Sequence, residues 1–265
     1  MLAAYVLVIY LWTERTRTQP IAGSVDEVSG IGRRRDIGVV AFAFALDFAF
    51  VAWFWSGGLP FRAYTGARHA LAAAGWDPVV ADKTANALLV TTETIMLAVV
   101  VLLLFKLRPW QLGLVPRAIG LGLVLSAAGL SLAPLSQALT GQTSLLWSGK
   151  WGILMVIAVV LIQPFINGLP EEFVFRGIIL SRLLALLRRP GPALVLSSVL
   201  FTGFHIPSVL AQPHSLGGVP AWIVIPGLLL TPTSEPTGLV WGYLFYRTRS
   251  IWPGAVWHTS TSVLG

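Results

Sequence analysis

Residues 37–55 read IGVVAFAFALDFAFVAWFW, an apolar run that contains one charged side chain, Asp47. An α-helix needs about 20 apolar residues to cross the ~30 Å hydrocarbon layer of a bilayer, so this run predicts a transmembrane helix. Met1–Trp12 is too short to span upright and is interpreted as a short first helix. Comparable or shorter apolar runs lie at residues 86–105, 118–139, 151–166, 192–210, 219–232, 238–247 and 251–265.

The composition of the whole chain agrees with this interpretation. Of the 265 residues, 55% are hydrophobic and 11% are charged, whereas soluble globular domains have roughly 45–50% apolar and about 25% charged residues. An ordinary cytosolic enzyme, a disordered chain and a coiled coil are therefore excluded. We predict an all-α, polytopic integral membrane bundle of about seven to eight transmembrane helices, some of them broken. Residues 1–265 are predicted to form a single integral membrane domain.

Basic residues indicate topology rather than nucleic-acid binding, although the net charge is +7. They lie mostly in short loops, and the positive-inside rule places the loops at residues 13–36 and 106–117 in the cytoplasm. The same orientation requires residues 151–187 to make one net crossing, broken near Gly168–Pro170. Such breaks are tolerated only where a helix is buried in protein or lines a wet cavity, so they predict a site. Cysteine is absent, which excludes disulfides, thiolate nucleophiles and Cys-ligated metals.

Ionisable side chains inside apolar runs mark functional candidates, because a charge at the bilayer centre is costly. For Asp47 and Glu93, pairing with a polar group of another helix is favoured over a catalytic role. His69 and His214 lie in loop-like sequence and are interpreted as solvated. The remaining candidates are Glu171, Glu172, Arg176, His205 and His258.

The densest cluster is PEEFVFRG, residues 170–177. Pro170 suits the first turn of a helix, and the helix dipole favours acidic residues there. Glu172 and Arg176 are spaced i,i+4 and can pair, while Glu171 is turned about 100° away. One carboxylate is thus neutralised by its own helix and the other stays free for chemistry. The alternative is that both acids only solvate a helix end with Arg176 as counter-ion.

Two further elements carry imidazoles: FTGFH at residues 201–205 and HTSTS at residues 258–262. His205, near a helix end, has the alternative of a satisfied interfacial residue. His258 and Ser262 share a helix face at i,i+4, although a serine in a membrane helix often bonds its own backbone. A carboxylate beside an imidazole can activate water, and a second imidazole can donate to an oxyanion. The pattern predicts hydrolysis by an activated water without a covalent intermediate.

These residues resemble the motifs of the CPBP intramembrane proteases, which include the Rce1-type CAAX prenyl endopeptidases and the bacterial Abi-like proteins. The family motifs are EExxxR, FxxxH and HxxxN, with Asp in some members. The resemblance covers roughly residues 151–265, the predicted catalytic core. The matching positions in this chain are Glu171, Glu172 and Arg176, then Phe201 and His205, then His258 and Ser262.

The resemblance implies roles for individual residues. Glu171 resembles the general base and His205 its partner in holding the hydrolytic water, while His258 resembles the histidine that stabilises the oxyanion. Ser262 stands where the family usually has Asn, and its hydroxyl is shorter and offers one donor where an amide offers two. Glu172, Arg176 and Phe201 are expected to support the site.

The predicted function is therefore a glutamate-dependent intramembrane endopeptidase that cleaves a membrane-associated peptide or protein, with a CAAX-type prenylated substrate as one option. The alternative, favoured by Ser262, is a non-catalytic membrane scaffold or bacteriocin-immunity-like protein with the same fold. A small-solute transporter would show broken helices in two related halves, and the breaks lie only in the C-terminal half.

No cofactor is expected. Zinc is the alternative, with Glu171, His205 and His258 as its ligands, although the chain has no HExxH pair. The expected partners are the lipid bilayer and a membrane-associated substrate, without nucleic acid. A composition rich in Ala, Leu, Val and Arg is typical of a bacterial source, so the predicted location is the plasma membrane as a multi-pass protein.

Overall fold

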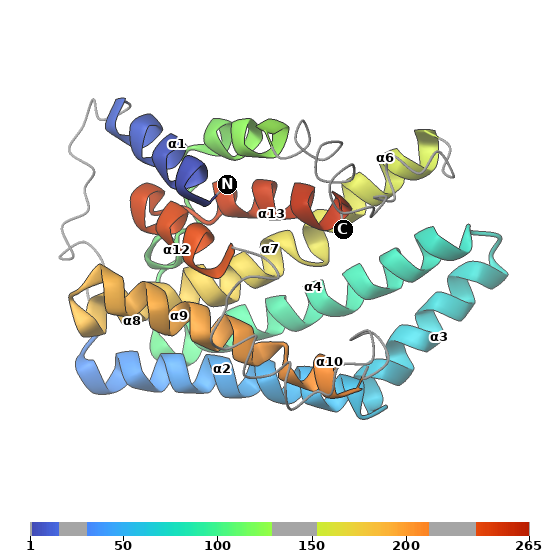
Figure 1. Cartoon of the computed structure of the whole chain (residues 1–265). Coiled ribbons are helices and arrows are strands. Elements are labelled where there is room, and N and C mark those ends of the chain that lie inside the picture. The colour runs from blue at the N-terminus through green and yellow to red at the C-terminus, as the bar shows by residue number, and fades with distance from the viewer. Residues whose placement is uncertain (1, 16–30, 129–152, 212–236, 265) are drawn as a thin grey trace.

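The computed structural model describes residues 2–15, 31–128, 153–211 and 237–264 (Figure 1). Within these ranges the elements are helices and turns. The predicted apolar run at residues 219–232 and part of the run at 118–139 lie outside the described residues. The helices are α1 (Leu2–Arg15), α2 (Arg33–Trp55), α3 (Leu59–Ala73), α4 (Pro78–Phe105), η2 (Pro109–Leu112), Ile119–Ala128, α6 (Ile153–Ile162), η3 (Gln163–Phe165), α7 (Gly168–Glu171), η4 (Glu172–Leu180), α8 (Ser181–Leu187), α9 (Pro190–Phe204), α10 (Ile206–Ala211), α12 (Thr237–Thr248) and α13 (Trp252–Leu264).

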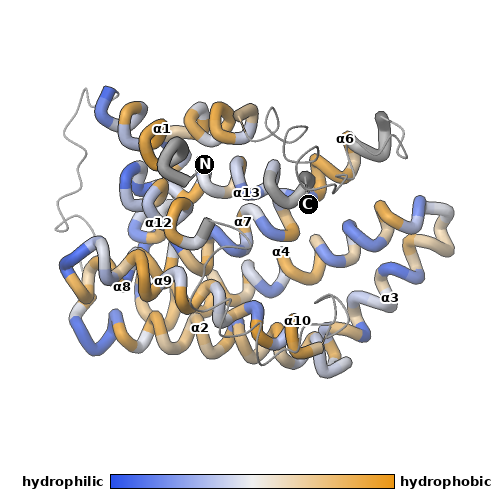
Figure 2. Tube along the Cα trace, in the orientation of Figure 1, coloured by the Kyte–Doolittle hydropathy of each residue, from blue (hydrophilic) through white to orange (hydrophobic). Residues whose placement is uncertain are grey.

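Four helical stretches in the described part are long and apolar enough to cross a membrane: Arg33–Trp55, Pro78–Phe105, Ile157–Leu187 and Pro190–Ala211. Much of α2 and α4 is orange in Figure 2, which marks hydrophobic residues along both helices, and several of these large apolar side chains are exposed. Leu103 of α4, for example, is 72% exposed. Large apolar side chains facing outward are suited to lipid rather than water. The predicted all-α polytopic membrane fold is confirmed.

Residues 56–85, which lie between two predicted apolar runs, contain the turn of a helical hairpin and not only a loop (Figure 1). They include α3, and α4 already begins at Pro78. The Asp77 carboxylate caps α4 by accepting hydrogen bonds from the backbone N–H groups of Val79 at 2.8 Å and Val80 at 3.4 Å. An Asp cap followed by Pro is a strong start signal that a hydropathy reading alone overlooks. His69 lies on α3, where it is exposed as expected.

The centre of the bundle is η4, a π-helical segment in which every residue is buried. Its two charged residues, Glu172 and Arg176, pair with each other, so the segment can lie in the interior of the protein. Around it pack apolar side chains from α2, α4, α9 and α12, including Val39, Leu97, Phe201 and Trp241. The segment that carries the predicted acidic cluster is therefore the best-protected part of the described fold.

The predicted break in this central crossing lies slightly before Gly168. A 3₁₀ turn, η3, ends α6, and Asn167 has a non-helical backbone before α7 begins. Gly168 then lies tightly against α13, because a Cβ at this position would be 2.5 Å from Thr259 Oγ1 and 2.7 Å from the Ala255 carbonyl oxygen. This close approach brings α13 against the acidic cluster.

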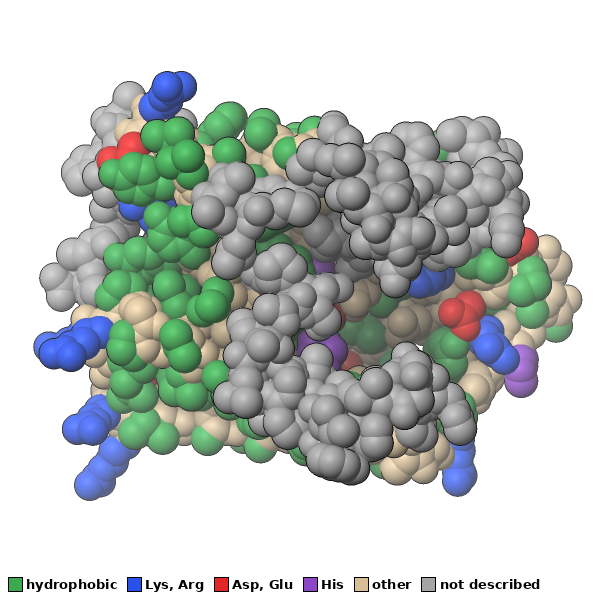
Figure 3. All heavy atoms as spheres, in the orientation of Figure 1, with side chains coloured by type: hydrophobic (Ala, Val, Ile, Leu, Met, Phe, Trp, Pro, Cys, Tyr) green, Lys and Arg blue, Asp and Glu red, His purple; other side chains and the backbone are tan. Residues whose placement is uncertain are grey.

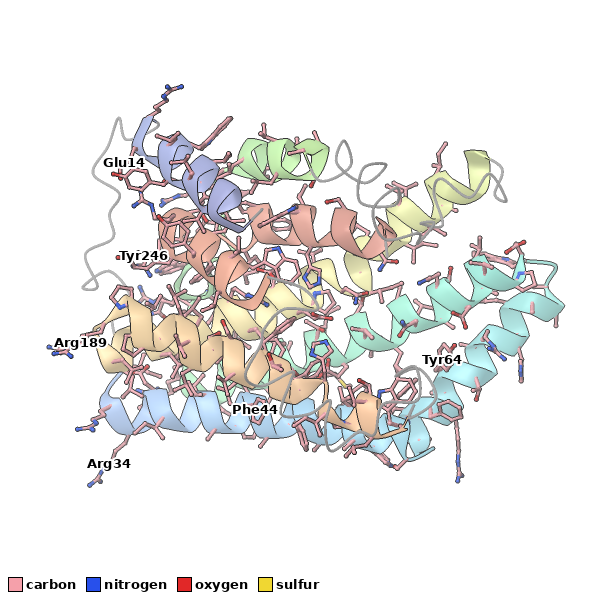
Figure 4. The ribbon with its side chains drawn as sticks, in the orientation of Figure 1. Glu14, Arg34, Phe44, Tyr64, Arg189 and Tyr246 are labelled. Carbon is pink, nitrogen blue, oxygen red and sulfur yellow. The ribbon has the colours of Figure 1, made fainter. Side chains whose placement is uncertain are left out.

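Basic side chains gather at one end of the bundle. Arg34 and Arg189 extend outward there, beside Glu14 and Tyr246 (Figure 4). Arg35 Nη2 at the start of α2 donates to the Phe105 carbonyl at the end of α4, at 2.6 Å. These loops agree with the positive-inside rule, while other basic residues, including Arg62 and Arg68, lie on α3 towards the other end.

Candidate active site

The acidic and imidazole side chains of the site come from three segments that meet beside η4. Glu171 ends α7 and Glu172 begins η4, His205 is the residue that caps the C-terminus of α9, and His258 lies within α13. In Figure 3 histidine side chains and acidic side chains are visible in a hollow in the middle of the displayed face. The fold thus brings together residues that are far apart in the sequence.

Glu172 and Arg176 form a sealed ion pair. Glu172 Oε1 lies 3.2 Å from Arg176 Nη1, and both side chains are 1% exposed. The guanidinium also faces two aromatic rings, with its Cζ 4.5 Å from the ring centroid of Phe201 and 5.2 Å from that of Trp241. A desolvated guanidinium is attracted to ring faces at such distances. Phe201 therefore packs against Arg176 at the edge of the acidic cluster.

His258 lies between the two glutamates. Its Nδ1 is 3.6 Å from Glu172 Oε1, and its Nε2 is 3.7 Å from Glu171 Oε2. The imidazole stacks on Trp241, with the ring centroids 3.8 Å apart and the planes 22° from parallel. These distances are longer than a hydrogen bond, so the ring faces the two carboxylates as a close polar contact. The Nε2 side of His258 thus faces Glu171.

Glu171 differs from Glu172 in its access to open space. Its side chain is 13% exposed, against 1% for Glu172, and it lines a cavity of about 500 Å³. His205 lines the same cavity. The sequence assigned the free carboxylate to Glu171 and the neutralised one to Glu172, and the two exposures agree with that division.

The hydrogen bonding of His205 identifies its tautomer. Its Nδ1 lies 2.9 Å from the Phe201 carbonyl oxygen. Because a carbonyl only accepts, Nδ1 carries the proton in this contact, and Nε2 of the neutral ring is an acceptor. The ring is held edge-on by Phe201 and Phe204, at centroid distances of 5.0 Å and 5.2 Å. His205 can therefore accept a hydrogen bond from a water in the cavity.

Two amide side chains that the sequence reading missed also hold Glu171. Gln163 Nε2 donates to Asn167 Oδ1 at 3.1 Å, and Asn167 Nδ2 donates to Glu171 Oε1 at 3.3 Å. The spacing of four residues between each of these positions was visible in the sequence. Together with His258 beside Oε2, this row of amides fixes the orientation of the carboxylate.

Aromatic side chains of α2 and α3 form part of the wall of the 500 Å³ cavity, among them Phe50, Phe54, Trp55, Phe61 and Tyr64. The Phe54 ring contacts Phe61 and Tyr64, with ring centroids 5.5 Å and 5.7 Å apart. Burial and the hydrogen bond to Asp82 raise the pKa of the Tyr64 phenol above its ordinary value, so this side chain remains a neutral donor. The cavity can thus accept a largely apolar chain and place part of it over Glu171.

Some predicted features are not placed in this site. The Ser262 side chain lies outside the described side chains, and so does His214. Asp47 of α2 and Glu93 of α4 are both buried and line one cavity, so each lies near a polar group of another helix, as expected for them. Among the described residues, no group of three His, Asp or Glu side chains is arranged to hold a metal ion.

Comparison with known proteins adds one match. Residues 149–264 match the family model described as type II CAAX prenyl endopeptidase Rce1-like. The matched segment contains the acidic cluster, both imidazoles and Ser262. Neither the curated proteins nor the solved structures gave a match. The family match covers the same part of the chain as the motif resemblance.

Proposed function

Because residues 149–264 belong to the Rce1-like family of type II CAAX prenyl endopeptidases, we propose that the protein is a glutamate-dependent intramembrane endopeptidase. It hydrolyses a peptide bond of a membrane-associated peptide or protein with an activated water. The observation that carries this proposal is the placement of Glu171. Its carboxylate shares a cavity with His205 and lies 3.7 Å from His258 Nε2.

The chemistry follows from the three side chains. A water in the cavity donates to the Glu171 carboxylate and to Nε2 of His205. Glu171 takes a proton from this water as the oxygen attacks the carbonyl carbon of the substrate, which is general-base catalysis. The carbonyl oxygen becomes an oxyanion and accepts a hydrogen bond from His258 Nε2–H. When the C–N bond breaks, Glu171 returns the proton to the leaving nitrogen.

The buried Glu172–Arg176 ion pair supports these reaction steps without touching the substrate. Glu172 lies beside Nδ1 of His258 and fixes the ring so that Nε2 points towards Glu171. Arg176 balances the charge of Glu172 in a site from which water is excluded. A buried carboxylate without this partner would be costly, so the pair keeps the arrangement ready for reaction.

The substrate class follows from the cavity and the membrane fold. Aromatic walls and a position between apolar helices suit a segment that approaches from the lipid bilayer. The family description adds a CAAX-type prenylated protein as one such substrate. We further propose that the protein works as a multi-pass protein of a bacterial plasma membrane, without nucleic acid as a partner.

This mechanism requires no metal, because a carboxylate and two imidazoles supply the base and the oxyanion donor. The test is cleavage after exhaustive treatment with a chelator, together with metal analysis of the purified protein. Full activity without bound metal is expected. Stoichiometric zinc, with activity that is lost on chelation and restored by zinc, would contradict the metal-free mechanism.

The function itself is tested with protein in proteoliposomes. Membrane proteins of a source strain and CAAX-type peptides are incubated with the wild type and with Glu171→Gln, and new termini are identified by mass spectrometry. Termini that appear only with the wild type support the proposal. A cellular phenotype that persists unchanged in Glu171→Ala would favour the non-catalytic scaffold, the alternative that Ser262 suggests.

A further inference from the structure

A second polar cluster lies next to the site and belongs to helices outside the family match. Asp47 of α2 and Glu93 of α4 are 4% and 8% exposed, and both carboxyl groups line one cavity as neighbours. Two carboxyl groups can share a hydrogen bond only if one of them carries a proton. In the described structure, no Lys, Arg or His forms an ion pair with either acid.

Asp47 and Glu93 line a second, smaller cavity beside the large one. This cavity has a volume of about 170 Å³, and its polar lining consists of Asp47, Glu93, Glu171 and the side chains of Asn86, Asn167 and Thr94. The second oxygen of Asp47, Oδ2, is buried and has no hydrogen-bond partner among the described residues. An acceptor buried in this way is normally paired, and the neighbouring Glu93 carboxyl is a group that can pair with it when one of the two acids is protonated.

The small cavity continues from the large one. Glu171, Asn167, Asn86 and Phe204 line both. A chain lying in the large cavity with its scissile bond over Glu171 would therefore have a neighbouring group at the mouth of the small cavity. The small cavity is a place for a side chain or chain end and not for a separate ligand.

The chemistry of the lining selects the group. A cation can replace a proton that lies between two acids, and both acids can then ionise. Charge-assisted hydrogen bonds from the cation offset the free-energy cost of burying the two carboxylates. A primary ammonium has three N–H donors, and two carboxylates with two nearby amide oxygens offer enough acceptors. At ~30 Å³ for each water in the liquid, the space is sufficient for the end of an aminoalkyl chain.

We propose that the Asp47–Glu93 cavity is a specificity site that binds a primary ammonium group of the substrate beside the scissile bond. The proposal rests on the endopeptidase function in assigning the group to a substrate, while the binding site itself stands on the geometry of α2 and α4. The ammonium belongs either to a lysine side chain or to the α-amino end of the substrate, and peptides distinguish these two sources.

The first test measures binding alone. n-Butylammonium is titrated by calorimetry into the detergent-solubilised wild type and into the Asp47→Asn/Glu93→Gln variant, with n-butanol as the uncharged control ligand. Each amide has the shape of a protonated acid, so the variant keeps a hydrogen-bonded pair. Glu14→Gln is the matched control, because Glu14 pairs with Arg247 on α12 and does not line either cavity.

Saturable binding of n-butylammonium to the wild type and to Glu14→Gln is expected, with affinity at least about tenfold weaker in the double variant. Equal binding by all three proteins, or equal binding of n-butanol, would overturn the proposal. Thermal unfolding of the two variants shows whether each is folded, and the single variants Asp47→Asn and Glu93→Gln replace the double variant if it is not.

The second test uses a cleaved reporter peptide in which lysine is moved through the positions flanking the cut. Lysine at one position is expected to raise kcat/KM by about tenfold over norleucine, and the double variant should abolish this preference. If N-terminal acetylation of the peptide has this effect instead, the α-amino end is the bound group. A preference that the double variant leaves intact, or a shifted pH profile without any preference, would contradict the proposal. Ammonium binding without any cleavage would count against the endopeptidase and not against this site.

Discussion

Gly254 on α13 lies against the carboxylate of Glu172, so that a Cβ at position 254 would be 2.4 Å from Glu172 Oε2 and 2.9 Å from Glu172 Cδ. Glu172 is held by Arg176 and by the approach of His258, and it cannot move aside without disturbing both. The absence of a side chain at position 254 is therefore a condition for placing His258 between the two glutamates.

We expect Gly254→Ala to lower the free energy of unfolding by about 1–3 kcal/mol, the usual cost of overpacking a filled interior. Cleavage should fall as well, because Glu172 is displaced. Gly66→Ala on α3 is the matched control, since a Cβ there meets no atom within 4 Å. The check is thermal unfolding and cleavage of both variants. A Gly254→Ala protein with wild-type stability and activity would contradict the packing described for α13.

Asn167→Ala should lower kcat by about tenfold, because it removes one charge-assisted hydrogen bond that orients Glu171. KM should change less than kcat, since Glu171 itself remains in place. Steady-state kinetics on one reporter peptide separate the two parameters. An unchanged kcat would show that the hydrogen bond from Asn167 does not position the base.

Arg176→Met should destabilise the protein by about 3–5 kcal/mol, because it leaves the Glu172 carboxylate buried without its cation. The double variant Glu172→Gln/Arg176→Met should be more stable than Arg176→Met alone, since neither position of the pair then carries a charge. Denaturant unfolding followed by tryptophan fluorescence provides the three free energies. A double variant less stable than Arg176→Met would contradict the view that the two residues act as a charge pair.

Ser262→Asn should keep or raise kcat, because an amide at this position supplies the donor that the family motif usually has. The comparison requires kcat of both proteins on the same peptide. Loss of cleavage in a folded Ser262→Asn protein would show that Ser262 does not stand where the family's Asn stands.

Most of the membrane fold could be predicted from apolar runs. Residues 37–55 and 192–210 correspond closely to the spanning helices α2 and α9–α10. The α3–α4 hairpin was missed, because Arg62, Arg68 and His69 interrupt the apolar residues of α3 and the hydropathy reading passed over the Asp77 cap. The π-helical course of η4 also leaves no mark in the spacing of apolar residues, since it depends on how the segment packs against its neighbours.

The contacts of the candidate site could be predicted where the two interacting residues are close in the sequence. The i,i+4 spacing indicated the Glu172–Arg176 pair, and the same rule applied to Gln163, Asn167 and Glu171 would have shown the amide row. The position of His258 between the glutamates was not readable, because it depends on the contact that Gly168 and Gly254 allow. The proximity of Asp47 and Glu93 to Glu171 likewise arises from the packing of α2 and α4 against α7.

The most direct test of the account is the cleavage rate of Glu171→Gln in proteoliposomes, with Glu14→Gln as the matched control. The amide has the size of the carboxylate and cannot take a proton from water, so kcat should fall by at least about 10² while Glu14→Gln stays at the wild-type rate. Cleavage of the same bond by Glu171→Gln at the wild-type rate would contradict the assignment of Glu171 as the general base.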